Sequence, residues 1–186
     1  TCALPISLAN ANISSNIYAI APLRLTMGGT TTYFYAIGGD YNLGTTSSRF
    51  FDLIQEDGND LANGTNPFGT LAQASIKAIE PSQMSGNTNQ GLYVGGTFDF
   101  GVNNKKNLLK LFLAGNVDPV FYTGAGPNEE VKAIKIHVKA GGTIQREVLI
   151  GGSFTSFDNT PANRLVVLKD NRTNTSDNGK IMVNEY

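Results

Sequence analysis

Short stretches in which apolar and polar residues alternate run along this chain, and three of them end in the same phrase. The phrase is a run of apolar residues, two glycines, one variable residue and an aromatic residue. Its three copies are Tyr35–Tyr41, Leu92–Phe98 and Val148–Phe154. Their first glycines, Gly38, Gly95 and Gly151, lie 57 and 56 residues apart. This near-constant interval predicts one supersecondary unit repeated three times, as in a propeller or a solenoid.

The alternation predicts four short strands in each unit. A first strand precedes each phrase, at Ile17–Ile20, at Ile76–Ile79 and at Val131–Ile134, where Lys135–Val138 continues it in the third copy. A third strand follows each phrase, at Arg49–Ile54, Asn107–Phe112 and Arg164–Leu168. A weaker fourth strand is expected at Val117–Phe121 and at Lys180–Val183. No sustained 3.6-residue period is present, so no helix longer than two turns is expected between residues 30 and 170.

A four-stranded antiparallel meander repeated in one register is typical of a propeller blade. The predicted fold is therefore all-β, a propeller segment of about three blades at residues 8–70, 71–125 and 126–186. Propeller rings have at least about four blades. Three blades are thus expected to form an open arc of a larger ring, or a strained and nearly closed set of three with a gap. In either case an apolar face is expected to be exposed on the first and on the last blade.

The diglycine has a structural interpretation. Glycine allows close approach of neighbouring backbone and side chains, so we expect Gly38, Gly95 and Gly151 at equivalent crowded positions near the ring axis. The aromatic residues that follow, Tyr41, Phe98 and Phe154, are expected to be buried between blades. A phosphate-binding loop is the functional alternative, but it requires a helix after the glycines, and none is predicted.

Composition narrows the function classes. The chain has 186 residues, 16% of them charged, and a formal net charge of −1, so nucleic acid is not an expected partner. No apolar run is long enough to span a membrane. Cys2 is the only cysteine, which excludes a disulfide framework.

The first residues are expected to be foreign to the domain. Back-translation of Thr1–Ile6 as acg tgt gct ctt ccg atc resembles the end of a common sequencing adapter. We therefore expect residues 1–7 to be a non-native leader and the native sequence to begin near Ser7 or Leu8. An ordinary mature N-terminus is the alternative.

Candidate chemical residues are sparse, and no catalytic, cofactor-binding or metal-binding set is predicted. His137 is the only histidine and is expected to be structural or exposed. Asp57–Asp60 lacks the spacing of a calcium loop and is expected to be a turn. Asn63 and Asn171 begin sequons, which matter only in a eukaryotic secretory setting. Carboxylates near predicted loops, which could pair only in three dimensions, are Glu80, Asp99, Glu129, Glu130 and Asp158.

Two stretches resemble the delta-60 repeat, a β-propeller repeat found mostly in large bacterial secreted or surface proteins. One is Val148–Thr155 with Asn163–Leu168, and the other is Gly115–Phe121 with Thr123–Gly126 and Val131–Ile134. The segment Asn59–Gly64 departs from the family's Asp-x-x-Phe pattern. The Kelch repeat is a weaker resemblance, because the chain has no Trp. The resemblance implies a propeller at an extracellular or cell-surface location, and it carries over no catalytic residue.

Two function classes remain open. The first is a non-catalytic interaction or scaffold module of a secreted or cell-surface bacterial protein. Its partners would be a protein or a glycan, together with further blades of the same parent chain. The second is a fragment of a propeller enzyme that acts on glycans through carboxylates in a central channel. Carboxylates of different blades that point into one channel would favour the enzyme. A solenoid-like structural stalk is a third interpretation.

Overall fold

The computed structural model describes residues 15–27, 30–40, 42–43, 47–48, 50–55, 68, 71, 73–83, 89–100, 105–113, 115–121, 124–138, 146–170 and 179–182. Over these residues the chain forms antiparallel sheets and no helix, as the alternating pattern predicts. The described residues thus include no helix that could cross a membrane. The three diglycine phrases each lie on a strand: β2 (Thr30–Gly39), β7 (Asn89–Asp99) and β10 (Arg146–Gly152).

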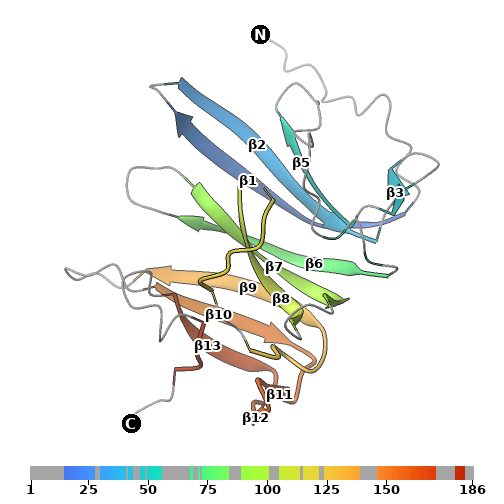
Figure 1. Ribbon diagram of the computed structural model, residues 1–186, viewed down its shortest axis with the longest axis vertical. Helices are drawn as coiled ribbons and strands as arrows, with labels where there is room; N and C mark the ends of the chain where they lie inside the picture. The colour runs from blue at the N-terminus through green and yellow to red at the C-terminus, as the bar shows by residue number, and fades with distance from the viewer. Residues whose placement is uncertain are drawn as a thin grey trace.

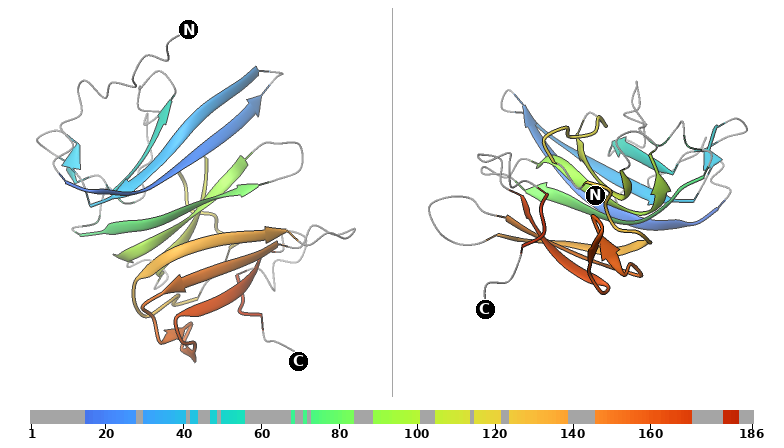
Figure 2. Two further views of the ribbon diagram at one scale, coloured as in Figure 1. Left: turned by 180° about the vertical axis from the view of Figure 1, so that it is seen from behind. Right: turned by 60° about the horizontal axis from the view of Figure 1, so that its bottom comes forward.

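Three three-stranded sheets follow one another in chain order (Figures 1 and 2). The first sheet consists of β1 (Ile17–Met27), β2 and β5 (Phe51–Gln55). The second consists of β6 (Ser75–Gln83), β7 and β8 (Lys106–Phe112). The third consists of β9 (Val131–Val138), β10 and β13 (Leu165–Asp170). The diglycine strand is central in every sheet, which leaves the first strand of each as an edge.

All three sheets have the same irregularity where the first strand meets the glycines. The register shifts between Ile17 and Ala19, between Ile76 and Ala78, and opposite Gly151 and Gly152. One extra residue therefore lies in a bulge of each first strand. These bulge residues are Tyr18, Lys77 and Lys132. The shared bulge confirms that the sequence repeat is a repeat of backbone structure.

The first strands of the first two sheets are longer than the alternation predicts, whereas β9 ends at Val138 as predicted. β1 and β6 continue through Pro22 and Pro81, which occupy equivalent positions five residues after Ile17 and Ile76. Proline interrupts a central strand because it has no N–H to donate. An edge strand tolerates it, because only one side of the strand requires ladder hydrogen bonds. In the sequence the prolines argue against a strand, but at the edge of a sheet the strand can continue through them.

The third strands match the prediction except for one residue of register. Gly38, Gly95 and Gly151 pair with Phe51, Leu108 and Leu165. The counterpart of Asn107 and Arg164 is therefore Phe50, not Arg49. The predicted start of this strand at Arg49 is therefore one residue earlier than the starts predicted in the other two units.

The fourth strand is reduced to single bridges. Val117 pairs with Leu111 of β8, and Ile181 pairs with Leu168 of β13. The predicted fourth strand of the first unit lies outside the described residues. The observed sheets are therefore three-stranded, and propeller blades in an open arc remain a prediction.

Two small ribbons extend from loops that follow central strands. β3 (Asn42–Leu43) pairs with β4 (Ser47–Ser48), and β11 (Ser156–Phe157) pairs with β12 (Thr160–Pro161). Asp158 and Asn159 join β11 to β12 with φ of 50° and 61°. Two such residues in a row are typical of a type I′ hairpin turn.

The hydrophobic core lies in two layers, one between each pair of successive sheets. We call the contact of the first and second sheets the first joint and that of the second and third sheets the second joint. Phe98 is buried in the first joint and Phe154 in the second, which confirms their predicted burial. Tyr41 lies outside the described residues. The second sheet is covered on both faces by these layers, which explains why its strands carry apolar residues on both faces.

The first glycine of each phrase in the first two sheets faces the next sheet. A methyl group at Gly38 would lie 2.9 Å from the Cβ of Ile76, and one at Gly95 would lie 3.0 Å from the Cβ of Val131. Ile76 is the second residue of β6, and Val131 is the first residue of β9. Gly38 and Gly95 therefore form sockets for branched side chains, which confirms their predicted crowding. The same prediction is wrong for Gly151, where an added Cβ would meet nothing nearer than 3.7 Å because no further sheet follows it among the described residues.

Candidate functional site

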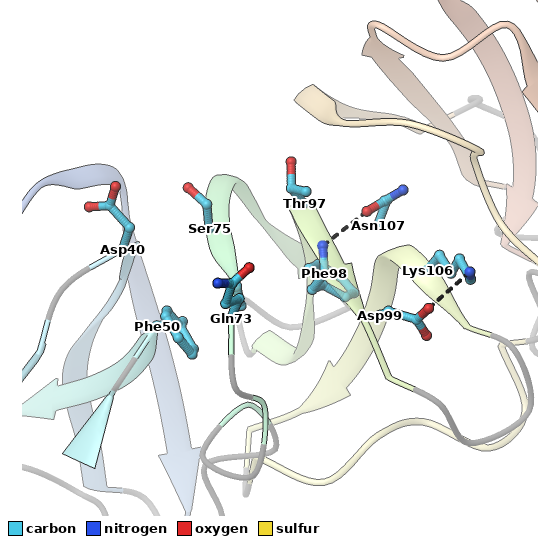
Figure 3. Close-up of a pocket in the computed structure, with 10 residues that line it drawn as sticks. Asp40, Phe50, Gln73, Ser75, Thr97, Phe98, Asp99, Lys106 and Asn107 are labelled. Carbon is cyan, nitrogen blue, oxygen red and sulfur yellow. Dashed lines mark hydrogen bonds and ion pairs between the residues drawn. The ribbon is translucent and has the colours of Figure 1, made fainter. Parts of the chain in front are cut away.

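A cleft of about 730 Å³ lies where the first and second sheets meet, beyond the ends of the diglycine strands (Figure 3). The first sheet's side contributes Asp40 and Phe50, and the remaining lining comes from the second unit. Those residues are Gln73, Ala74, Ser75, Thr97, Phe98, Asp99, Lys106 and Asn107. The cleft is within the size range of small-ligand pockets, about 300–1,000 Å³.

Asp40 directly follows the first diglycine. Its carboxylate accepts hydrogen bonds from the Ser15 hydroxyl at 2.9 Å, the Asn16 backbone N–H at 3.0 Å and the Tyr18 hydroxyl at 2.9 Å. Desolvation raises the pKa of Asp40, but these hydrogen bonds outweigh it and lower the pKa below its ordinary value. Asp40 is therefore an ionised group held in place at the start of β1.

The second carboxylate of the cleft comes from the other sheet. Asp99 forms an ion pair with Lys106 at 2.9 Å across the register irregularity between β7 and β8. Both side chains are about half exposed, so this pair contributes little to stability. The first and second sheets thus each place one carboxylate on a shared cleft (Figure 3).

Asn107 fixes the wall of the cleft. Its φ is 61°, a left-handed conformation that Asn tolerates better than most residues. Its Oδ1 accepts from the Phe98 backbone N–H at 2.9 Å, and its Nδ2 donates to the Pro127 carbonyl at 3.0 Å. Asn107 therefore links β7, β8 and the segment that leads into the third sheet.

The remaining lining combines accessible polar groups with an aromatic floor. Gln73 and Thr97 are exposed, whereas Phe50 and Phe98 are buried beneath them. Phe68 packs edge-on against Phe98 with ring centroids 5.1 Å apart, which holds the floor rigid. Amide and hydroxyl groups above fixed aromatic rings can hydrogen-bond and pack against a polar ligand.

A second polar cluster is fully buried in the second joint. Lys110 Nζ lies 2.8 Å from the Asp170 carboxylate and 3.7 Å from that of Asp118. Arg146 approaches Asp170 at 3.8 Å, and the Tyr93 hydroxyl donates to the same carboxylate. Burial raises the pKa of Tyr93 well above its ordinary value, and the charge of Asp170 adds to this effect. Two cations and two carboxylates balance, so the cluster is a neutral clamp between sheets.

The carboxylates singled out from the sequence are scattered over the fold. Only Asp99 lines the cleft. Glu80 binds Lys135 at 2.8 Å across the second joint, and Asp158 accepts from the Ala125 backbone N–H at 2.9 Å. Glu129 is exposed, and Glu130 contacts Lys132 at 3.4 Å. His137 is exposed on β9 opposite Glu147, which agrees with its predicted position.

Sequence reasoning missed Asp40 and the buried clamp. Asp40 had a signal, because the variable residue after each diglycine is polar: Asp40, Thr97 and Ser153. The clamp had none, because Lys110 and Asp170 sit in ordinary strand patterns 60 residues apart. The candidate turn Asp57–Asp60 and the sequons at Asn63 and Asn171 lie outside the described residues.

Comparisons of the chain with protein-family models, with curated proteins and with solved structures find no match.

Proposed function

We propose that this chain is a non-catalytic interaction module built from β-propeller blades, and that the cleft of the first joint binds a short polar ligand of the glycan type. One observation carries the proposal: a cleft of about 730 Å³ lined by amide, hydroxyl and aromatic groups from two sheets. The cleft is open to solvent, and its volume is within the range of small-ligand sites.

The propeller arrangement is part of the proposal. It is supported by three successive sheets with one bulge, one central glycine pair and one socket contact between neighbours. The resemblance to the delta-60 repeat supports a bacterial secreted or cell-surface protein as the parent. A rigid stack of sheets with loops at its edges is a common platform for ligand binding.

Both cleft carboxylates favour binding over catalysis. A glycosidase needs one carboxylic acid that keeps its proton near the working pH. The pKa of Asp40 is lowered by its hydrogen bonds, which makes it a poor proton donor. Asp99 is held by Lys106. These groups are suited to accept hydrogen bonds from sugar hydroxyls.

Glycan binding is tested on an array of bacterial and host cell-surface glycans, followed by calorimetry with any glycan that binds. We expect Gln73→Ala and Thr97→Val each to weaken binding severalfold, because each removes a hydrogen-bonding group. Thr160→Val, the same change at an exposed residue of the third unit, should leave affinity unchanged. Equal affinity of the Thr97 and Thr160 variants would exclude the cleft as the binding site.

An enzyme acting on glycans is the second candidate. It is favoured by one observation, that Asp40 and Asp99 of different units line the same cleft. Incubation of the protein with the bound glycans, with assay for new reducing ends, tests it. Turnover that disappears in both Asp40→Asn and Asp99→Asn would replace the binding proposal with the enzyme.

A further inference from the structure

The third sheet ends in an empty copy of the socket that forms both joints. A methyl group added at Gly151 would meet only the Arg164 carbonyl at 3.7 Å and the Ala133 Cβ at 3.9 Å, both of its own sheet. Leu165, the ladder partner of Gly151, is 61% exposed. Its counterparts Phe51 and Leu108 are 2% and 0% exposed, because the next sheet covers each of them.

The first sheet presents the matching knob. Ile17 and Ile20 occupy the positions of Ile76 and Ile79, which fill the Gly38 socket, and the same bulge separates each pair. Ile20 is 66% exposed. Ile20 on the first sheet and Leu165 on the last are thus both exposed. They are moreover the two complementary halves of one joint.

We propose that the partner of these two faces is a second copy of this chain, with β1 of one copy docked on the β9–β10 face of the other. The occupant follows from continuity with the two joints inside the chain, since β1 presents what β6 and β9 present. In the first joint Lys77 of β6 lies over the ring of Tyr18, with Nζ 3.2 Å from the ring centroid. The new joint brings Tyr18 beside Lys132, which repeats this cation–aromatic pairing in reverse order.

The joint is head-to-tail, so each copy offers one socket and one knob. Such contacts either close into a ring or continue as a filament. Two copies supply six sheets, which is within the range of about 4–8 blades of closed propellers. The closed dimer rests on the propeller arrangement proposed above, whereas the joint rests only on the contacts at Gly151 and Ile20.

Light scattering coupled to gel filtration, over a wide range of concentrations, measures the assembly. We expect a species of twice 19.8 kDa that dissociates on dilution. Gly151→Val fills the socket and should give a folded monomer, because a Cβ at this position makes only ordinary van der Waals contacts, at 3.7 and 3.9 Å, within its own sheet. Ile20→Asp and Leu165→Asp should also be monomeric. Val120→Asp, at a 40% exposed valine near neither face, should remain dimeric.

Mixing the variants establishes the direction of the joint. Ile20→Asp retains an intact socket face and Leu165→Asp retains an intact knob, so their equimolar mixture should regain a species of twice the monomer mass through one joint. A head-to-head dimer predicts instead that one of the two variants dimerises alone. Circular dichroism of each monomer confirms that loss of mass is not loss of fold.

Wild-type protein that stays monomeric at every concentration overturns the proposal and leaves the face to a further unit of a longer chain. A dimer that Gly151→Val and Ile20→Asp both leave intact overturns it as well. The measurement involves no glycan, so failure of this joint and failure of the proposed binding function are separate results.

Discussion

The two joints of this chain use one backbone device and fill the remaining space in opposite ways. In both, a glycine of the central strand receives a branched residue from the next sheet. Around this contact the first joint is apolar, with Phe68 in ring contact with Phe51, Phe98 and Phe100. The second joint instead buries Lys110, Asp118, Asp170 and Arg146. The repeat thus determines how the sheets approach each other and leaves the filling to each unit.

Equivalent positions make this difference explicit. Leu53 pairs with Ala36 in the first sheet, and Lys110 pairs with Tyr93 in the second. An alanine and a leucine leave an apolar surface, whereas a tyrosine and a lysine require buried partners. Asp118 and Asp170 supply them. Removal of any single charged member of the cluster should therefore destabilise the second joint, because it leaves a buried charge unpaired.

The largest expected effect comes from Lys110→Met. It leaves Asp118 and Asp170 buried without their main cation, and we expect the free energy of unfolding to fall by about 3–5 kcal/mol. Urea denaturation measures this loss. Leu53→Met is the matched control, because it places the same residue at the equivalent position of the first joint.

The control should lose less than about 1.5 kcal/mol, since it exchanges side chains of similar volume. Equal losses in the two variants would show that the buried charges contribute no more than ordinary packing. The two joints would then not differ in how much these positions contribute to stability.

A methyl group on each socket glycine should have a smaller and position-dependent effect. Gly38→Ala and Gly95→Ala force a Cβ against the next sheet, and we expect each to cost about 1–3 kcal/mol. Gly151→Ala has room and a backbone conformation open to alanine. In dilute monomer it should be neutral or stabilising by about 0.4–1 kcal/mol.

Thermal melts of the three alanine variants, at a concentration where only monomer is present, decide this. A destabilised Gly151→Ala monomer would mean that the repeated glycines serve the fold of their own sheet. Contacts with the next sheet would then not explain why glycine occupies these three positions.

The sequence predicts the repeated part of this fold and not the part that differs between units. The all-β class, the strands on the diglycine phrases and the burial of Phe98 and Phe154 follow from local alternation and from the 57- and 56-residue intervals. β1 extends past its predicted end because Pro22 lies on an edge, and edge position is a property of the sheet rather than of the strand.

The cleft and the clamp lie beyond local pattern for the same reason. Asp40 and Asp99 meet because two sheets stack, and Lys110 meets Asp170 across 60 residues of sequence. Periodicity places each of these residues on a strand or at its end. Only the stacking of sheets decides which of them share a cavity.

The smallest expected effect is a difference in alkaline stability between the joints. The pKa of Tyr93 is raised above its ordinary value, mainly by burial and then by the charge of Asp170. The folded state therefore holds this proton more tightly than the unfolded state does. The stability that results is complete below the unfolded pKa of about 10 and is lost as the pH rises from there toward the folded pKa.

Tyr93→Phe isolates this contribution. The variant loses the hydrogen bond to Asp170, so at neutral pH we expect it to be less stable by about 1–2 kcal/mol. As the pH rises above about 10, the gap between variant and wild type should shrink, because the unfolded wild type is stabilised by ionising its phenol while the folded wild type keeps the proton. Lys105, whose pKa burial lowers, is present in both proteins and cancels in the difference. Urea melts of both proteins across this pH range measure the gap.

The apolar cluster of the first joint contains no ionisable side chain. At high pH we therefore expect the backbone amides of β9 and β10 to exchange with solvent before those of β1 and β2. A gap that stays constant with pH would place the Tyr93 hydroxyl in contact with solvent. The second joint would then depend on pH no more than the apolar first joint does.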